Sequence, residues 1–253
     1  MTAPRRDHRI AFTLTELLVV IVIIAILAAL LFPVLGRITA RSRTAECVSN
    51  LRQLGASILA YTGDHDGVLP PAWMRKSKGA QYDQYWPGIL VAGKYLTAPS
   101  SPDIAQVPRK SVLLCPAANR QADTSWSVGT SPATLDKAQV FAAVYEDADG
   151  TVYYHTSYAI NASTAYATWP FVQYPKTDTD GVVESRLVQL EKPSQTVMLY
   201  DGKGMHNTSS VRIKWQHEDL QKTCFVFFDG HAEALPAQAW DVGNVDAFPR
   251  FKK

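Results

Sequence analysis

The stretch FTLTELLVVIVIIAILAALLFPVL, residues 12–35, decides the architecture of this chain. It contains one acidic residue, Glu16, and the next charged residue is Arg37. An apolar run of about 20 residues can cross the hydrocarbon core of a bilayer as a helix, because each residue adds about 1.5 Å of length. We therefore expect a membrane helix near the N-terminus.

A secretory signal peptide is the alternative interpretation of this run. Such a peptide has a short apolar core followed by a cleavage site of small residues, whereas this core is long and ends in Phe32-Pro33. Glu16 points to a function, because a carboxylate near the start of a membrane helix is costly to bury without a positive partner. An α-amino group, made by cutting the chain a few residues upstream, would be such a partner.

The residues around this position resemble the N-terminal signal of type IV prepilins and type II secretion pseudopilins. The sequence AFTLTE, residues 11–16, follows a short basic leader and precedes an aliphatic helix that contains Pro33. The resemblance implies that a prepilin peptidase cuts between Ala11 and Phe12 and methylates the new amine of Phe12. It also implies that Glu16 neutralises the amine of a neighbouring subunit, and that Pro33 is a helix-breaking position. The chain departs from the family at Ala11, where Gly is usual.

The same resemblance implies a pilin-like α+β fold, with a long N-terminal helix packed on an antiparallel β-sheet. The expected parts are a leader (1–11), the transmembrane or assembly half of the helix (12–36), its amphipathic half (37–62) and an extracytoplasmic head (63–253). Apolar residues recur at helical spacing through the amphipathic half, namely Val48, Leu51, Leu54, Ile58 and Tyr61. The helix is expected to end at Gly63, where turn residues begin.

Composition and charge restrict the partners of the head. About 200 residues follow the apolar run, which is enough for one domain with a core of its own. The net charge is +2, and no stripe of Lys and Arg with interleaved aromatic residues is present, which argues against nucleic acid. The resemblance implies other partners: copies of the chain or other pilins and pseudopilins, the prepilin peptidase, and inner-membrane lipid.

Charge alone leaves the orientation in the membrane open. Basic residues precede the apolar run at positions 5, 6 and 9 and follow it at positions 37, 41 and 43. The resemblance favours a single-pass protein of the bacterial inner membrane, with the leader in the cytoplasm and the head in the periplasm. After assembly the chain would belong to a filament or to the cell surface.

The head is expected to be rich in β-structure. Seven candidate strands precede the last turn: Val112–Cys115, Phe141–Tyr145, Thr151–Tyr158, Val182–Leu190, Thr196–Tyr200, Val211–Trp215 and Thr223–Phe228. An acidic Gly-containing turn joins the second and third of them. Asp229-Gly230 then predicts a hairpin turn, with His231–Leu235 as the returning strand.

Short blocks of the head extend the resemblance to a group of pseudopilin-like proteins. The blocks are residues 47–71, 113–117, 157–161, 193–202 and 225–233. That group has a C-terminal pattern of His, a spacer and Asp-Gly. His217 and the Asp229-Gly230 pair fit this pattern.

The three cysteines, Cys47, Cys115 and Cys224, cannot all pair within one chain. None of them stands in a CxxC motif, which argues against a zinc site. A disulfide between Cys47 and Cys115 is permitted outside the cytoplasm, and free thiols are the alternative. Cys224 begins the apolar run CFVFF and is expected to be a small buried side chain.

Acidic residues suggest a metal site in the head. The candidate ligands are Asp64, Asp66, Asp201 and Asp229, with the histidines 65, 217 and 231 and Glu233 close to them in sequence or pattern. Carboxylate oxygens suit calcium, and no other cofactor is expected. The alternative is turn chemistry, because Asp and Gly also tolerate the geometry of tight turns. The run TDTDG, residues 177–181, is rejected as an EF-hand loop because Lys176 and Leu187 occupy the first and last ligand positions.

Catalysis has little support in the sequence, and the chain is expected not to be an enzyme. It has no Gly-x-Ser-x-Gly motif, and only His217, Asp229 and His231 form a set of catalytic type. The predicted function is a structural subunit of a type IV pilus or of a type II secretion pseudopilus. The alternative is a membrane-anchored extracytoplasmic binding module or enzyme that uses a His/Asp cluster.

Overall fold

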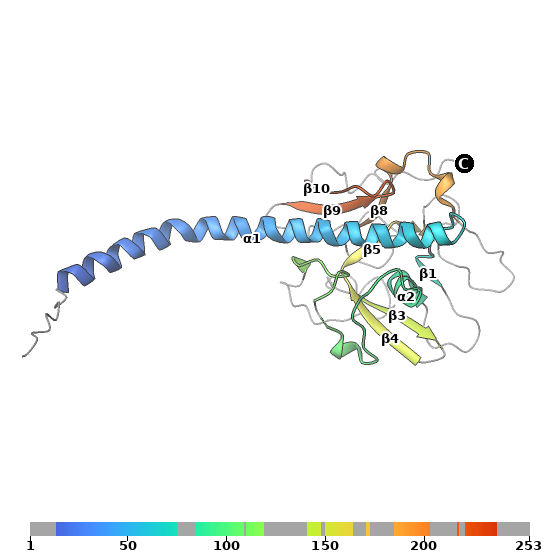
Figure 1. The fold of residues 1–253 in the computed structure, drawn as a ribbon, viewed down its shortest axis with the longest axis horizontal. Helices are drawn as coiled ribbons and strands as arrows, with labels where there is room; N and C mark the ends of the chain where they lie inside the picture. The colour runs from blue at the N-terminus through green and yellow to red at the C-terminus, as the bar shows by residue number, and fades with distance from the viewer. Residues whose placement is uncertain are drawn as a thin grey trace, which may run out of the picture. The chain divides into compact units, whose positions relative to one another are not determined.

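A computed structural model describes residues 14–74, 84–108, 110–118, 141–147, 150–163, 171–172, 185–202, 217 and 221–236 of the 253. The chain divides into two compact units, Met1–Thr39 and Ala40–Lys253. Helix α1 contributes to both, and every strand in the described residues belongs to the second unit (Figure 1). The expected α+β class, a long N-terminal helix with an antiparallel sheet, is therefore confirmed.

Helix α1 runs from Leu14 to Asp64 and contains 51 residues. Its end lies one residue beyond the expected position at Gly63, which is within the ordinary uncertainty of helix boundaries. Pro33 was expected to be a helix-breaking position. It lies inside α1, and the helix continues past it without a break. A proline removes one N–H from the helical ladder, but the flanking apolar residues are good helix formers and continue the helix.

The helical part of the first unit exposes its apolar side chains. Sixteen of the seventeen exposed large apolar side chains in the described residues lie between Leu14 and Ile38, and they are 46% to 82% exposed. Among the described helices, α1 is the one long and apolar enough to cross a membrane, with a mean hydropathy of 3.4 in its most apolar window. Among the described residues, nothing covers the hydrophobic surface of this segment.

The second unit is built on a four-stranded antiparallel sheet. Its strands are β5 (Tyr158–Ile160), β8 (Val197–Asp201), β9 (Lys222–Phe227) and β10 (Ala232–Pro236), in the order β10-β9-β8-β5. The predicted turn joins β9 to β10, and the N–H of Gly230 donates to the carbonyl of Phe227 at 3.0 Å. Gly230 has φ +87°, a left-handed conformation that glycine adopts without a Cβ clash.

The second half of α1 packs on this sheet. Leu51, Leu54 and Ile58 are completely buried, as the helical spacing predicted. Gly55 lies between them on the sheet side, where an added Cβ would come within 2.9 Å of a methyl group of Val226 in β9. Glycine is thus needed at this position for the helix to approach the sheet closely.

The remaining described elements flank this core. They are β1 (Trp73–Met74), β2 (Gln84–Tyr85), α2 (Trp86–Ala92), the 3-10 helices η1 (Ile104–Gln106), η3 (Leu187–Gln189) and η4 (Pro193–Gln195), β3 (Phe141–Asp147), β4 (Gly150–Thr156), β6 (Ala162–Ser163) and β7 (Phe171–Val172). β3 and β4 form the expected antiparallel pair. β1 pairs antiparallel with β2, and β6 pairs parallel with β7.

Three strand predictions need correction. Val112–Cys115 forms a turn, because the carbonyl of Ser111 accepts from the N–H of Leu114 at 3.0 Å and its hydroxyl accepts from that of Leu113 at 3.2 Å. The range expected as Thr151–Tyr158 is divided at Ser157 into β4 and β5. In the range 182–190, the described residues form a bridge and η3 rather than a strand. The expected strand Val211–Trp215 lies outside the described residues.

Candidate functional site: a buried thiol, imidazole and carboxylate cluster

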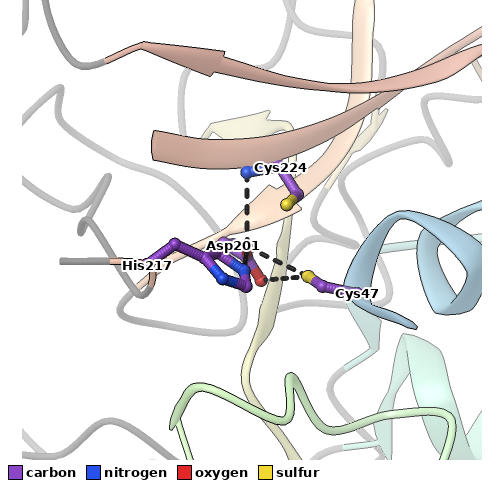
Figure 2. A group of neighbouring side chains, drawn as sticks. All are labelled: Cys47, Asp201, His217 and Cys224. Carbon is purple, nitrogen blue, oxygen red and sulfur yellow. Dashed lines mark hydrogen bonds and ion pairs between the residues drawn. The ribbon is translucent and has the colours of Figure 1, made fainter. Parts of the chain in front are cut away.

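Four chemically reactive side chains meet beneath α1 in the second unit. Figure 2 shows Cys47, Asp201, His217 and Cys224 with their side chains directed toward one another. One donor atom from each lies within 4.8 Å of the donor atoms of the other three, and all four residues are buried. We call this set the buried cluster.

Local structure explains how distant positions converge. Cys47 precedes Leu51 and Leu54 on the buried face of α1, since residues four and seven apart share one side of a helix. Asp201 ends β8 and Cys224 lies in the neighbouring strand β9, where the pair Tyr200–Phe225 sets the register. His217 is placed by a backbone bridge to Lys222, the first residue of β9.

Asp201 makes contacts with the other three members. Its two carboxylate oxygens each lie 3.1 Å from the Cys47 sulfur, whose S–H donates to them. Its Oδ2 accepts from the backbone N–H of Cys224 at 3.2 Å and lies 3.3 Å from Nε2 of His217. A completely buried carboxylate needs partners of this kind, because burial removes the water that would otherwise stabilise its charge.

The ring of His217 is oriented by Thr44 of α1. The hydroxyl of Thr44 lies 3.1 Å from Nδ1 of His217 and also donates to the carbonyl of Ala40 at 3.1 Å. A hydroxyl has one hydrogen, so Thr44 can bond to Nδ1 at the same time only by accepting the proton of Nδ1. The opposite nitrogen, Nε2, therefore faces the buried cluster, 3.4 Å from the sulfur of Cys115.

Two further residues contact the cluster at its edge. The hydroxyl of Tyr158 in β5 donates to the Cys47 sulfur at 3.4 Å. Cys115 is also completely buried, and its backbone N–H donates to the hydroxyl of Ser157 at 2.6 Å. All three cysteines of the chain thus gather at one place.

These contacts change the acid–base properties of the cluster. Burial raises the pKa of the Cys47 thiol well above its usual value, and the neighbouring thiols and Asp201 add to this increase. Burial opposes ionisation of Cys115 too, yet its contacts with Cys47 and His217 lower its pKa. Burial lowers the pKa of His217, but its hydrogen bonds to Asp201 and to the thiols of Cys115 and Cys224 outweigh this effect. They raise the pKa of His217 to about 12.

Because its pKa is raised, His217 is cationic in the empty cluster and pairs with the carboxylate of Asp201. Burial also raises the pKa of the Tyr158 hydroxyl well above its usual value, so this group remains a hydrogen-bond donor. Sulfur, imidazole nitrogen and carboxylate oxygen are all metal-binding atoms. As a nucleophile, however, a thiol here would face packed protein, because Cys47, Cys115 and Cys224 have no exposed surface.

The structure does not bring the four predicted calcium ligands together. Asp201 belongs to the buried cluster, whereas Asp64, Asp66 and Asp229 are exposed. Asp64 accepts from the hydroxyl of Tyr95 at 3.0 Å. Asp66 has φ +52°, as expected for a turn residue. Turn chemistry, the alternative that the sequence left open, describes Asp66 and Asp229, whereas Asp64 is the last residue of α1.

The set His217, Asp229 and His231 is also divided. Asp229 and His231 contact each other on the exposed hairpin between β9 and β10, where their side chains are 38% and 42% exposed. His217 is 4% exposed and belongs to the buried cluster. The pattern of His, spacer and Asp-Gly therefore joins a core residue to a turn and does not form one site.

The other candidate positions can be placed as follows. Ala11 and Phe12 lie outside the described residues, while Glu16 lies in the first turn of α1 and is exposed. Cys47 and Cys115 are neighbours, but both are free thiols in the structure, without the disulfide that the sequence permitted. Cys224 is buried as expected, but it also belongs to the cluster, which the sequence interpretation missed.

Comparison with known proteins identifies the N-terminal segment. Residues 6–32 match the prokaryotic N-terminal methylation motif. No curated protein and no solved structure matches the chain. The match covers the expected cut between Ala11 and Phe12, Glu16 and most of the apolar run. The chain thus has the signal of a substrate of prepilin peptidase, as in type IV pilins and pseudopilins.

Proposed function

We propose that this chain is a structural subunit of a filament of the type IV pilus or type II secretion pseudopilus kind. The observation that carries the proposal is the methylation motif over residues 6–32, which marks substrates of prepilin peptidase. In this proposal the peptidase removes residues 1–11 at the cytoplasmic face and methylates the amine of Phe12. The head is on the opposite side of the inner membrane.

The exposed apolar surface of α1 supports assembly through this helix. Residues 14–38 expose large apolar side chains in nearly every turn, and this surface is stable in lipid before assembly. In a filament, the same side chains would pack against the corresponding helices of other copies or other pilins. Assembly then exchanges contacts with lipid for contacts between helices.

Glu16 gives the assembly its register. It is the acidic residue in the first turn of α1, four residues after Phe12. A carboxylate among apolar helices is favourable only when it is paired, and the amine of Phe12 in a neighbouring copy supplies the opposite charge. Subunits in which these two groups meet are stabilised relative to any other axial offset.

The head acts in this proposal without catalysis. The four side chains of the buried cluster have almost no exposed surface among the described residues, so they offer a substrate no open site there. This argues against the alternative, an extracytoplasmic enzyme or binding module that uses a His/Asp cluster. The acidic and histidine side chains at the exposed β9–β10 hairpin fit a turn, as described above.

The N-terminus of the native protein tests processing. Mass spectrometry of the chain from its own cells should find N-methylated Phe12 as the first residue. The variant Ala11→Arg should retain Met1 or the intact leader, because a long cationic side chain replaces the small one at the cut. Ala3→Arg is the matched control and should be processed normally. A native chain that retains its leader would contradict the proposal and support an uncleaved anchor.

The variant Glu16→Ala tests assembly separately from processing. It should be cleaved at Phe12 and keep a folded head, yet be lost from purified filaments by at least about tenfold, a loss expected for an ion pair in an apolar environment. Glu46→Ala is the control, since Glu46 is an exposed carboxylate in the amphipathic half of the same helix. Normal incorporation of Glu16→Ala would overturn the role of this residue.

A further inference from the structure

We propose that the buried cluster is a zinc site, in which Cys47, Asp201, His217 and Cys224 bind one Zn²⁺ ion and tie α1 to the sheet. This proposal is independent of filament assembly. It assigns a bound metal ion to the buried cluster, which neither the methylation motif nor the sequence patterns do.

The donor set favours zinc over calcium. Two thiols, one imidazole and one carboxylate match the sulfur and nitrogen ligands of tetrahedral Zn²⁺ sites. Calcium takes six to eight oxygen ligands, and the cluster offers one carboxylate. Thiolate ligands likewise disfavour magnesium and manganese, which prefer oxygen. The donor atoms of the buried cluster therefore suit a thiolate-binding ion such as zinc better than an oxygen-binding ion such as calcium or magnesium.

The distances fit one ion. Zinc bonds of about 2.0–2.3 Å in a tetrahedron place neighbouring donor atoms roughly 3.3–3.8 Å apart. Here Nε2 of His217 lies 3.3 Å from Oδ2 of Asp201, at the lower end of this range, and the sulfur of Cys47 lies 3.1 Å from both oxygens of that carboxylate, slightly closer than the range. The largest separation within the set is 4.8 Å, so small side-chain rotations close the tetrahedron.

The surrounding residues already orient the donors. Thr44 accepts from Nδ1 of His217, which leaves Nε2 as the metal-binding nitrogen. A hydrogen bond to the second nitrogen is the usual support of a zinc-bound histidine. Tyr158 donates to the sulfur of Cys47, and the N–H of Cys224 donates to Asp201. These donors stabilise the negative charge that the ligands acquire when they bind metal.

Zinc binding replaces protons. The ion displaces one proton from each of the Cys47 and Cys224 thiols and one from Nε2 of a cationic His217. The occupied site then holds Zn²⁺ with two thiolates, one carboxylate and a neutral imidazole, a net charge of −1. The empty cluster, with neutral thiols and a His217–Asp201 ion pair, is neutral. No electron is transferred.

Cys115 stands beside this set as the competing donor. Its sulfur is 3.4 Å from Nε2 of His217, and it is a neighbour of Cys47. Replacing Asp201 by Cys115 would give three cysteines and one histidine, a common ligand set of structural zinc sites. We assign Asp201 because its oxygens contact Cys47 and His217 directly and because its donor atom falls within the compact set.

The test is metal analysis of the full-length chain, purified in detergent micelles without added chelator. We expect about one zinc per chain, with near-complete loss in Cys224→Ser, His217→Ala and Asp201→Ala. Cys115→Ser should retain it. His231→Ala is the matched control: this histidine lies beside Asp229 and Glu233 on the surface and would hold only adventitious zinc. A wild-type chain that binds no zinc after dialysis against micromolar Zn²⁺ overturns the proposal.

Measurements on the wild-type chain alone remove any dependence on folding of the variants. Stripping the ion with a chelator should lower the melting temperature by about 10 °C, and adding zinc back should restore it. Exchange with Co²⁺ should produce the intense visible bands of tetrahedral coordination and a thiolate charge-transfer band. Octahedral Co²⁺ bands without charge transfer would contradict the assignment.

Thiol counting separates the metal site from a disulfide. After denaturation in chelator, the zinc-bound protein should release three reactive thiols. One reactive thiol together with no zinc would show that two of the three cysteines form a disulfide in the native protein, and the zinc proposal would fail. Zinc retained in Asp201→Ala but lost in Cys115→Ser would overturn the ligand set proposed here.

Discussion

The two halves of α1 belong to one helix, but one half exposes its apolar side chains and the other buries them. Residues 14–38 expose theirs, while Leu51, Leu54 and Ile58 in the second half are completely buried against the sheet. The second half makes its hydrophobic contacts within the chain on one face only. Its apolar residues therefore recur at helical spacing, with polar residues between them. The first half is apolar on all sides, which suits the surroundings of lipid or other subunits that the proposed function gives it.

We expect the largest difference between the two halves when an apolar residue of each is replaced by aspartate. Leu54→Asp should cost at least about 4 kcal/mol and unfold the head, because it buries an unpaired polar group in a packed core. Leu27→Asp should leave the unfolding free energy of the head unchanged, since Leu27 is 62% exposed. It should instead impair membrane insertion, by about 3 kcal/mol.

Denaturant titration of the full-length chain in detergent, monitored by tryptophan fluorescence, measures the first effect. Trp86, completely buried in α2, is a suitable reporter. Membrane fractionation measures the second. A folded head in Leu54→Asp would show that α1 is not part of the core.

Glycines give a finer comparison of the same two halves. Gly55→Leu should destabilise the head by about 3 kcal/mol, because the space beyond its Cβ is occupied by Val226. Gly36→Leu meets no atom within 4 Å and should leave the head unchanged. Equal effects of the two substitutions in denaturant titration would mean that the helix does not approach β9 closely.

Arginines give the smallest expected effect. Arg52 donates from Nη2 to the carbonyl of Ala232 at 3.1 Å, linking α1 to β10. Arg52→Ala should therefore cost about 1 kcal/mol of unfolding free energy. Arg41→Ala, at an exposed position before the sheet contact, should change it by less than about 0.5 kcal/mol. An equal loss in both variants would indicate a general effect of charge rather than this hydrogen bond.

Local sequence signals predicted the helix and the hairpins well. The spacing of Leu51, Leu54 and Ile58 identified the buried face of α1, and Asp229-Gly230 marked the turn between β9 and β10. Both features arise from residues close together in the chain. Val112–Cys115 was wrong as a strand because serine side-chain hydrogen bonds formed a turn in an apolar run.

The buried cluster could not be predicted in this way. Its members come from a helix, two strands and one residue bridged to β9, with no two in a metal-binding spacing. The sequence presents Asp201 as a candidate ligand and Cys47 as a candidate disulfide partner, but Cys224, at the start of CFVFF, has the pattern of an ordinary core residue. The available signal was coarse: Cys47, Cys115 and Asp201 stand in three of the blocks that resemble other pseudopilin-like heads, and Cys224 directly precedes a fourth. Only the tertiary fold shows that these blocks meet.

The contact between Thr44 and His217 spans 173 positions of the chain, and that between Cys47 and Asp201 spans 154. Contacts between such distant positions form late, because the intervening chain must first be ordered. Because the chain is synthesised from its N-terminus, most of the head is made after Cys47 and before its carboxylate partner, Asp201. The polar junction beneath α1 therefore cannot be complete before β9 has been made, and a chain truncated before β9 lacks Cys224.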